Sequence, residues 1–415
     1  MSRALAIEAR RGVGPATGVL VVAVLVAGLL AHQRDWVGDW TGSSYYLRFL
    51  VVLAGPVVVA AAAWQGGRGQ RRGLQELLDS TSRDPLRRTL VAWSSPALWG
   101  GAAYLLVVAA AAAVTATRTS YGLPLLGVLT SGLAVLLALA AVGYGIGQLL
   151  PWRLTAPVLA LSTYVLITVL SFRQDGLRFL SPAIEPNGLY YLLPVRWWAG
   201  ASTALYLALA VAALLLTAHH RRTGALALAV AVTAAVPLAR AGDRAFVPDR
   251  DAAAVVCADG NAIDVCLTRR HADQLATVTQ LANTVLGGLQ TPPSIVEGYS
   301  RDSRVERTGP GVTVGLNELY LGPTLTGGPD LAVLRQDLAG AMTTWGCDPF
   351  TDPMPEDLYG PAFRIQQWLA ARTGTADPGL GSATHLHTLA AINDYRLAAG
   401  RCDAAGARRA AAVLS

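Results

Sequence analysis

Long, nearly uninterrupted runs of apolar residues fill the first 240 residues of the chain. Most of these runs approach the roughly 20 residues with which an α-helix crosses the hydrocarbon core of a bilayer. The pattern predicts about seven transmembrane helices, which fall at residues 17–31, 47–64, 97–115, 122–150, 155–172, 199–218 and 224–239. After residue 240 the pattern changes to that of a water-soluble domain. The sequence therefore predicts a mainly α-helical fold, with a transmembrane domain over 1–240 and a second domain over 241–415.

The second domain is expected to be mostly helical, because apolar residues recur there at helical spacing from Leu275, Leu331, Phe363 and Leu386. Thr268 is the predicted N-cap of the first of these helices. Before it, the stretch VVCADGNAIDVC alternates around a D-G-N turn, which predicts a short β-hairpin.

All four cysteines lie in this second domain. The predicted hairpin places Cys257 opposite Cys266, so we expect the disulfides Cys257–Cys266 and Cys347–Cys402, although four cysteines allow three pairings. A zinc site is the alternative use of four cysteines. The absence of any C-x-x-C pair argues against zinc.

Every basic residue other than histidine is an arginine, and the arginines gather in alternate loops between the apolar runs. They precede the first run and fill the second, fourth and sixth connections, which the positive-inside rule assigns to the cytoplasm. We therefore expect a multi-pass protein of the cell (inner or plasma) membrane with a cytoplasmic N-terminus. Seven crossings then place the second domain outside the cytoplasm, where disulfides persist. A cleaved signal peptide is the alternative for the first run, but no clear A-x-A site follows it.

The missing residue types exclude several kinds of chemistry. Without lysine the chain has no P-loop and no Schiff-base nucleophile. Neither an H-E-x-x-H nor a G-x-S-x-G motif is present, so His271, His385 and His387 are not predicted metal ligands. The carboxylates Glu356 and Asp357 fall in a proline-rich stretch that is typical of a loop. We expect no enzyme, cofactor or metal site, and the net charge of +6 is no sign of nucleic acid because arginines flank membrane spans.

Few ionisable residues fall inside the apolar runs, and such residues are the strongest signal of a transport pathway. Arg48 lies near the outer boundary of its run, where we expect its guanidinium to snorkel to the surface. The aromatic pairs Tyr190–Tyr191 and Trp197–Trp198 could line a substrate path, but an interfacial belt is the simpler interpretation. In the fourth run, Gly143, Gly145 and Gly147 predict close packing of a neighbouring helix.

The connection between the second and third runs, residues 64–93, is too long for a tight turn. Its leucines at 74, 77 and 78 form an apolar stripe at helical spacing, which suits docking to a protein partner or to lipid headgroups. Together with the stretch ALAIEARR before the first run and the long outer segment FRQDGLRFLSPAIEPNGLYYLLPVRWW, the loop sequence GLQELLDSTSR resembles the permease subunits of type-2 ABC exporters, particularly the actinobacterial type.

This resemblance implies a six-span permease core over 1–218, with the seventh span at 224–240 and the second domain as additions. It implies an exporter powered by a separate cytoplasmic ATP-binding subunit, and a dimer with an identical or sister permease in membrane lipid. The loop at 66–93 would then couple the two proteins through Gly73, Leu74, Glu76, Leu77, Leu78, Ser80, Thr81 and Arg83.

Two alternatives stay open. The loop could be an arginine-rich connection that only sets orientation. The chain could also be a non-transporting sensor or scaffold, anchored in the membrane, whose outer domain binds a ligand or partner.

Overall fold

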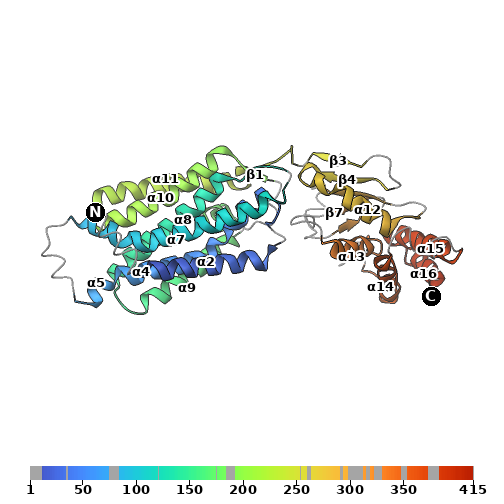
Figure 1. Cartoon of the computed structure of the whole chain (residues 1–415), viewed down its shortest axis with the longest axis horizontal. Coiled ribbons are helices and arrows are strands. Elements are labelled where there is room, and N and C mark those ends of the chain that lie inside the picture. Colours follow the sequence, from blue (N-terminus) through green and yellow to red (C-terminus); the bar gives the residue numbers. More distant parts are fainter. Residues whose placement is uncertain are drawn as a thin grey trace. The chain divides into compact units, whose positions relative to one another are not determined.

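The structure, a computed structural model, describes residues 12–33, 36–73, 84–119, 121–173, 175–183, 192–252, 254–258, 263–289, 293–297, 312–314, 318–321, 330–346, 353–372 and 383–414. The chain divides into two compact units (Figure 1). Unit 1 comprises Met1–Thr119 and Leu123–Asp249, and unit 2 comprises Ser120–Gly122 and Arg250–Ser415.

Unit 1 is a bundle of long helices (Figure 1). Its helices are α2 (Gly14–Ala31), α3 (Trp40–Phe49), α4 (Val51–Gly66), α5 (Arg68–Arg71), α7 (Pro85–Ala116), α8 (Leu126–Leu149), α9 (Thr155–Ser171), α10 (Arg196–Thr217) and α11 (Arg221–Ala241). The short elements are η2 (Gly176–Leu180), η3 (Gly242–Ala245) and the antiparallel strands β1 (Leu192–Pro194) and β2 (Phe246–Pro248).

Each apolar run of the sequence forms a helix of this bundle. Within the described part of the chain, six helices are long and apolar enough to cross a membrane, with α3 and α4 together forming one of them. This chain is therefore a membrane protein. The run predicted at 155–172 forms α9, whose 17 residues fall just short of that length, so a seventh span stays a prediction.

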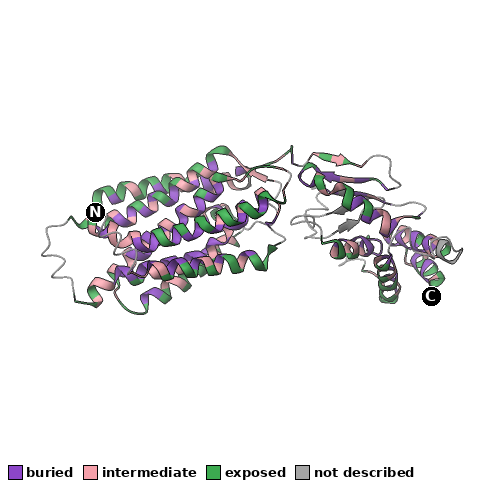
Figure 2. Ribbon diagram, viewed as in Figure 1, coloured by how far each residue is buried: buried purple, intermediate pink, exposed green. Residues whose placement is uncertain are grey.

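The outward faces of the bundle are apolar, as lipid contact requires. Large side chains such as Leu106, Leu161 and Leu226 are exposed on the helices, and Figure 2 shows the buried residues turned towards neighbouring helices. In water such a surface would be an aggregation liability. In a bilayer it is solvated by hydrocarbon.

The glycines of the fourth run allow α8 to approach α4 closely, as predicted. A Cβ atom added at Gly147 would lie 2.1 Å from the carbonyl oxygen of Ala63, and one at Gly143 would lie 2.5 Å from that of Val59. Both distances are shorter than any real Cβ contact. Because the two glycines are four residues apart, they share one face of α8.

Unit 2 joins a five-stranded mixed sheet to a set of helices (Figure 1). The strands are β3 (Val255–Cys257), β4 (Val265–Thr268), β5 (Ser294–Glu297), β6 (Val312–Val314) and β7 (Glu318–Leu321), in the order β3-β4-β5-β7-β6. The helical elements are η4 (Arg269–Gln274), α12 (Leu275–Leu286), α13 (Leu331–Ala341), α14 (Glu356–Ala371), α15 (Ala383–Gly400) and α16 (Ala404–Val413).

The predicted hairpin is confirmed. Strands β3 and β4 are antiparallel, and Cys257 lies opposite Cys266, to which it forms a disulfide. Cys402 is also disulfide-bonded, and its predicted partner Cys347 lies outside the described residues.

The prediction of a mostly helical domain is confirmed by α12 to α16, but it missed most of the sheet, because β5, β6 and β7 extend the predicted hairpin. Strands β4 and β5 are parallel, and so are β5 and β7. A parallel pair needs a crossover connection, which η4 and α12 supply between β4 and β5. The extra strands are only three or four residues long, too short for a period-two pattern to appear in the sequence.

A single apolar core holds the helices on this sheet. It combines Val265, Leu267 and Ile295 from the strands with Val278 and Val285 from α12, all of them fully buried.

Glu356 and Asp357, predicted to lie in a loop, instead form the first turn of α14. Carboxylates in the first turn interact favourably with the helix dipole.

Candidate functional site

Most of the predicted coupling residues lie outside the described residues, namely Leu74, Glu76, Leu77, Leu78, Ser80, Thr81 and Arg83. Gly73 is described. It has a φ of +65°, a left-handed conformation that glycine adopts without strain. Nothing lies within 4 Å of the position where its Cβ would be. Gly73 therefore lies in a turn after α5, with space around its Cα.

The residues on either side of this segment have different contacts. Before it, Gln70 Nε2 donates a 2.9 Å hydrogen bond to the carbonyl of Gln148 at the end of α8. Arg71 donates to the carbonyl of Trp64 and stacks its guanidinium 4.4 Å above the Trp64 ring. After it, the Asp84 side chain caps α7 by accepting from the Leu86 N–H. The flank before the segment is therefore tied to α4 and α8, and the flank after it is the capped start of α7.

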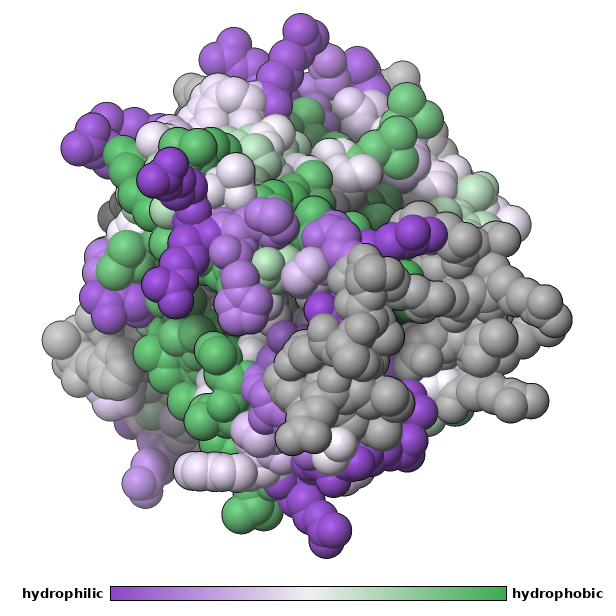
Figure 3. Space-filling model, turned by 90° about the vertical axis from the view of Figure 1, so that its left-hand side faces the viewer, coloured by the Kyte–Doolittle hydropathy of each residue, from purple (hydrophilic) through white to green (hydrophobic). Residues whose placement is uncertain are grey.

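The end of the bundle that carries this segment is rich in arginine. We call it the arginine-rich end; it holds Arg68, Arg71, Arg72, Arg87, Arg88, Arg153, Arg221 and Arg222, at the ends of α4, α8 and α10 and the starts of α7, α9 and α11. Figure 3 faces this end and shows hydrophilic side chains gathered across it. Burial, and then repulsion from Arg153, lower the pKa of Arg71, so positive charge is crowded here.

A second constellation lies towards the opposite end of the bundle, around Arg48. The prediction that Arg48 snorkels to the surface is wrong: it is 1% exposed. At 1.5 Å per residue it sits about 12 Å along the helix from Trp40, the first residue of α3.

The guanidinium of Arg48 lies among helices that are far apart in the sequence. Its Nη2 is 3.3 Å from Ser202 Oγ on α10 and 3.5 Å from the carbonyl oxygen of Ser181, directly after η2. Its Cζ is 4.6 Å from the ring centroid of Trp198.

Trp198 is fully buried, so its assignment to an interfacial belt is also wrong, while the exposed Trp197 fits that belt. Tyr190 and Tyr191 lie outside the described residues.

The side of α10 that faces Arg48 is a polar stripe. Trp198, Ser202 and Tyr206 follow each other at four-residue spacing, which puts them on one face of the helix. On α8, Gly132 makes room for the cluster, because a Cβ there would lie 2.5 Å from the Tyr104 hydroxyl and 3.7 Å from Arg48 Cα.

Three tyrosines complete the surroundings. The hydroxyls of Tyr45, Tyr104 and Tyr206 are near enough to interact electrostatically with the guanidinium, and the Tyr206 oxygen also accepts a hydrogen bond from it. Each donates its own proton to a backbone carbonyl, at 3.2 Å to Leu192, 3.2 Å to Leu129 and 2.7 Å to Leu180, respectively. The tyrosines therefore supply dipoles to Arg48 but no negative charge.

The hydrogen-bonding capacity of this cluster is not used up. Within the described part of the chain, Arg48 Nε and Nη1 have no acceptor, and neither does the indole Nε1 of Trp198. No described carboxylate forms an ion pair with Arg48. A buried charge without a partner costs several kcal/mol, and an ionisable residue inside a membrane span marks a functional site by default.

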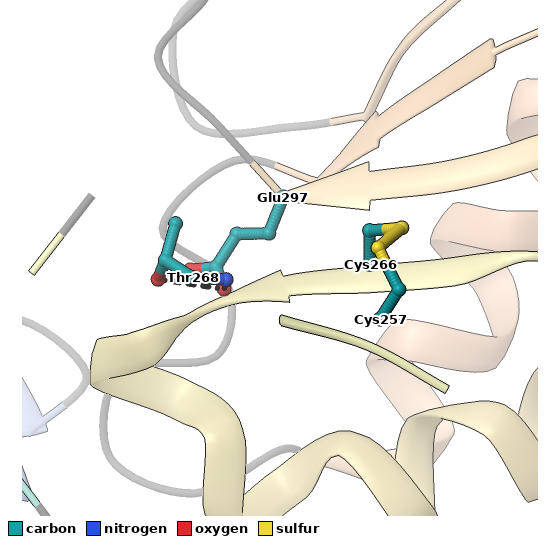
Figure 4. The surroundings of a disulfide bond; sticks show 4 residues. All are labelled: Cys257, Cys266, Thr268 and Glu297. Carbon is teal, nitrogen blue, oxygen red and sulfur yellow. Dashed lines mark hydrogen bonds between the residues drawn. A yellow bond between two sulfur atoms is a disulfide. The ribbon is translucent and has the colours of Figure 1, made fainter. Parts of the chain in front are cut away.

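Unit 2 has a buried polar cluster of a different kind, around Glu297 at the end of β5 (Figure 4). Glu297 Oε2 accepts hydrogen bonds from the backbone N–H of Thr268 at 2.9 Å and from its hydroxyl at 3.0 Å. His271 Nδ1 lies 2.5 Å from Oε1. Thr268 precedes η4, but its predicted capping role is not confirmed, because its side chain makes no cap hydrogen bond and bonds to Glu297 instead.

The three histidines considered as metal ligands, His271, His385 and His387, do not assemble a metal centre in the part of the chain that the structure describes. No group of three His, Cys, Asp or Glu side chains there could hold a metal ion. His271 is buried beside Glu297 and His387 is exposed, while the side chain of His385 lies outside the described set.

Comparison of the chain with protein-family models, with curated proteins and with solved structures gave no match.

Proposed function

We propose that this chain is the membrane subunit of an ATP-driven exporter, with ATP hydrolysed by a separate cytoplasmic subunit. The observation that carries the proposal is the arginine-rich end, where a long segment runs from α5 to α7 between two spans and Gln70 ties α5 to the end of α8. A partner that docks on this segment can transmit a push into the helices on both sides of it.

The proposal includes a topology. Positive charge faces the cytoplasm in membrane proteins, so the arginine-rich end is inside. Helix α9 acts as a span in spite of its length: its 17 residues reach about 25 Å, and a bilayer thins locally around a short helix. Seven spans then put unit 2 outside the cytoplasm, in keeping with the Cys257–Cys266 disulfide.

Within this proposal Gly73, Leu74, Glu76, Leu77, Leu78, Ser80, Thr81 and Arg83 form the contact with the ATPase, and a second copy or a sister permease completes the pathway. The resemblance of GLQELLDSTSR to the exporter loop supplies the residue assignment.

The test is mild detergent extraction of the tagged full-length protein, followed by mass spectrometry of the proteins that co-purify and an ATPase assay of the complex. We expect an ATP-binding protein with a Walker lysine to co-purify with the wild type and to be lost with Glu76→Arg. Glu356→Arg, which reverses the charge of an exposed carboxylate on unit 2, is the matched control and should retain it.

Retention of the ATPase by Glu76→Arg would remove the coupling loop from the proposal. If no ATPase accompanies the wild type, the exporter proposal fails. The alternative of a membrane-anchored sensor or scaffold, with unit 2 as its working part, would then take its place.

A further inference from the structure

We propose that the Arg48 cluster binds the anionic group, a carboxylate or a phosphate monoester, of an amphiphilic cargo. That the ligand is a transported cargo rests on the proposed export function, whereas the binding site is inferred from the cluster itself. Arg48 and Trp198 bring three N–H donors without acceptors into one buried place.

The geometry of the donors suits a planar or tetrahedral oxyanion. The guanidinium offers a rigid fork of donors that matches carboxylate and phosphate oxygens in pairs. Nη2 is already engaged by Ser202 and Ser181, which fixes the plane of the group. Nε and Nη1 lie on different edges of the guanidinium, so each can donate to a separate oxygen. A two-oxygen fork forms beside either of them when Nη2 exchanges one of its long contacts, at 3.3 and 3.5 Å, for the anion.

The uncompensated positive charge of Arg48 argues against a purely structural role. A side chain that only ties α3 to α10 needs hydrogen bonds, and a neutral polar residue could supply them without the penalty of an uncompensated buried cation. Arg48 bears that penalty in the absence of any described counter-charge. An anion that enters the site would remove the penalty, and it would interact strongly because water is excluded.

The body of the ligand follows from the lining. Apart from the two serines, the residues around the guanidinium are aromatic, and Phe246 packs on Trp198 with a centroid distance of 5.2 Å. Sugars and peptides need many hydrogen-bonding partners, which this lining does not offer. A single anionic head on a hydrocarbon body does fit. Such a group can come from a membrane lipid or from a free amphiphile, and the experiment separates these sources.

The experiment uses purified full-length protein in a neutral detergent, with binding measured by isothermal titration calorimetry and by the shift in Tm. The probes are dodecylphosphate, the zwitterionic dodecylphosphocholine with the same chain, and inorganic phosphate. Wild-type protein should bind dodecylphosphate at least about tenfold more tightly than dodecylphosphocholine, and Arg48→Gln should abolish that difference. Binding of inorganic phosphate with similar affinity would overturn the amphiphile assignment.

For the lipid source, the protein is placed in nanodiscs of phosphatidylcholine with or without phosphatidylglycerol, and the lipid that it retains is identified by native mass spectrometry. Phosphatidylglycerol retained by the wild type and lost with Arg48→Gln would identify a membrane lipid as the ligand. Dodecylphosphate binding without lipid retention would identify a free amphiphile.

Three further variants keep the inference falsifiable if Arg48→Gln does not fold. Trp198→Phe keeps the ring beneath the guanidinium but removes the Nε1 donor, so the affinity for dodecylphosphate should fall severalfold. Ser202→Ala should have a smaller effect, because its hydroxyl serves Nη2. Arg173→Gln is the matched control, since Arg173 is exposed and paired with Asp175 at 2.6 Å, and it should bind like the wild type.

Equal binding of the two detergents by the wild type, or an equal loss with Arg173→Gln, would overturn the inference. These outcomes are independent of the ATPase, because the measurements use this chain alone. A complex that retains its ATPase but shows no anion preference would leave the exporter proposal standing and remove only the cargo assignment.

Discussion

Arg48 in unit 1 and Glu297 in unit 2 are both withdrawn from solvent, at 1% and 0% exposure, yet their surroundings differ. The oxygens of Glu297 are met by the backbone and hydroxyl of Thr268 and by His271. Arg48 meets dipoles and an aromatic face, and it retains two donors without acceptors. The satisfied group ties secondary structure together. Arg48 keeps hydrogen-bonding capacity that does not contribute to the stability of the fold. A binding site requires such capacity.

Glu297→Ala should disrupt the cluster around this paired carboxylate, in which only Nε2 of His271 lacks a partner among the described residues, with the largest effect of the three changes. It leaves the Thr268 N–H and hydroxyl, and the His271 ring, buried without their acceptor, so unit 2 should lose about 3–5 kcal/mol of unfolding free energy. Chemical denaturation of the full-length protein, followed by circular dichroism, measures the change. The control Glu356→Ala, at an exposed first-turn carboxylate, should lose less than about 1 kcal/mol.

A loss as small for Glu297→Ala as for the control would mean that this cluster does not support the fold, and the contrast with Arg48 would disappear.

Arg48→Met should act in the opposite direction. An apolar side chain of similar length would remove the desolvation penalty of the buried, uncompensated charge, which is on the order of several kcal/mol per ion. The Tm of the detergent-solubilised protein should therefore be unchanged or higher, while the preference for dodecylphosphate is lost. Arg173→Met should leave the unfolding free energy within about 0.5 kcal/mol of the wild type. A large drop in Tm for Arg48→Met would identify Arg48 as a structural tie.

The smallest effect is expected at an exposed pair, Asp357 on α14 and Arg408 on α16, which are joined at 2.6 and 3.0 Å. The hydrogen bond from Arg408 lowers the pKa of Asp357. Because the folded-state pKa lies below the ordinary value of about 3.9, the pair contributes its full stability above that value. The contribution is lost as the pH falls through the lower, folded-state pKa.

The difference in Tm between wild type and Asp357→Asn should accordingly be small near neutral pH and shrink further below about pH 4. Added salt should reduce it as well, because solvent screens exposed charges. A difference that grows on acidification would contradict the assigned sign.

Local patterns were sufficient for much of the architecture. Apolar runs predicted the helices of unit 1, because a bilayer imposes length and hydrophobicity on every span. The glycines predicted that a neighbouring helix packs closely on α8, which the structure identifies as α4, and the alternation around a D-G-N turn predicted the Cys257–Cys266 pair. Strands β5, β6 and β7 were missed, since their short sequences are strands only because neighbouring strands pair with them.

The sequence by itself therefore determined that the chain enters a membrane, which residues form its helices and which end of the bundle gathers arginine. These properties depend on composition and on spacing within one segment. Only the tertiary structure decided that Arg48 is enclosed. A position near the end of an apolar run is equally compatible with snorkelling, and the outcome depends on Trp198, Ser202 and Ser181, which lie more than 130 residues further along the chain. Burial of a charge is a property of the packed bundle, so no local pattern records it.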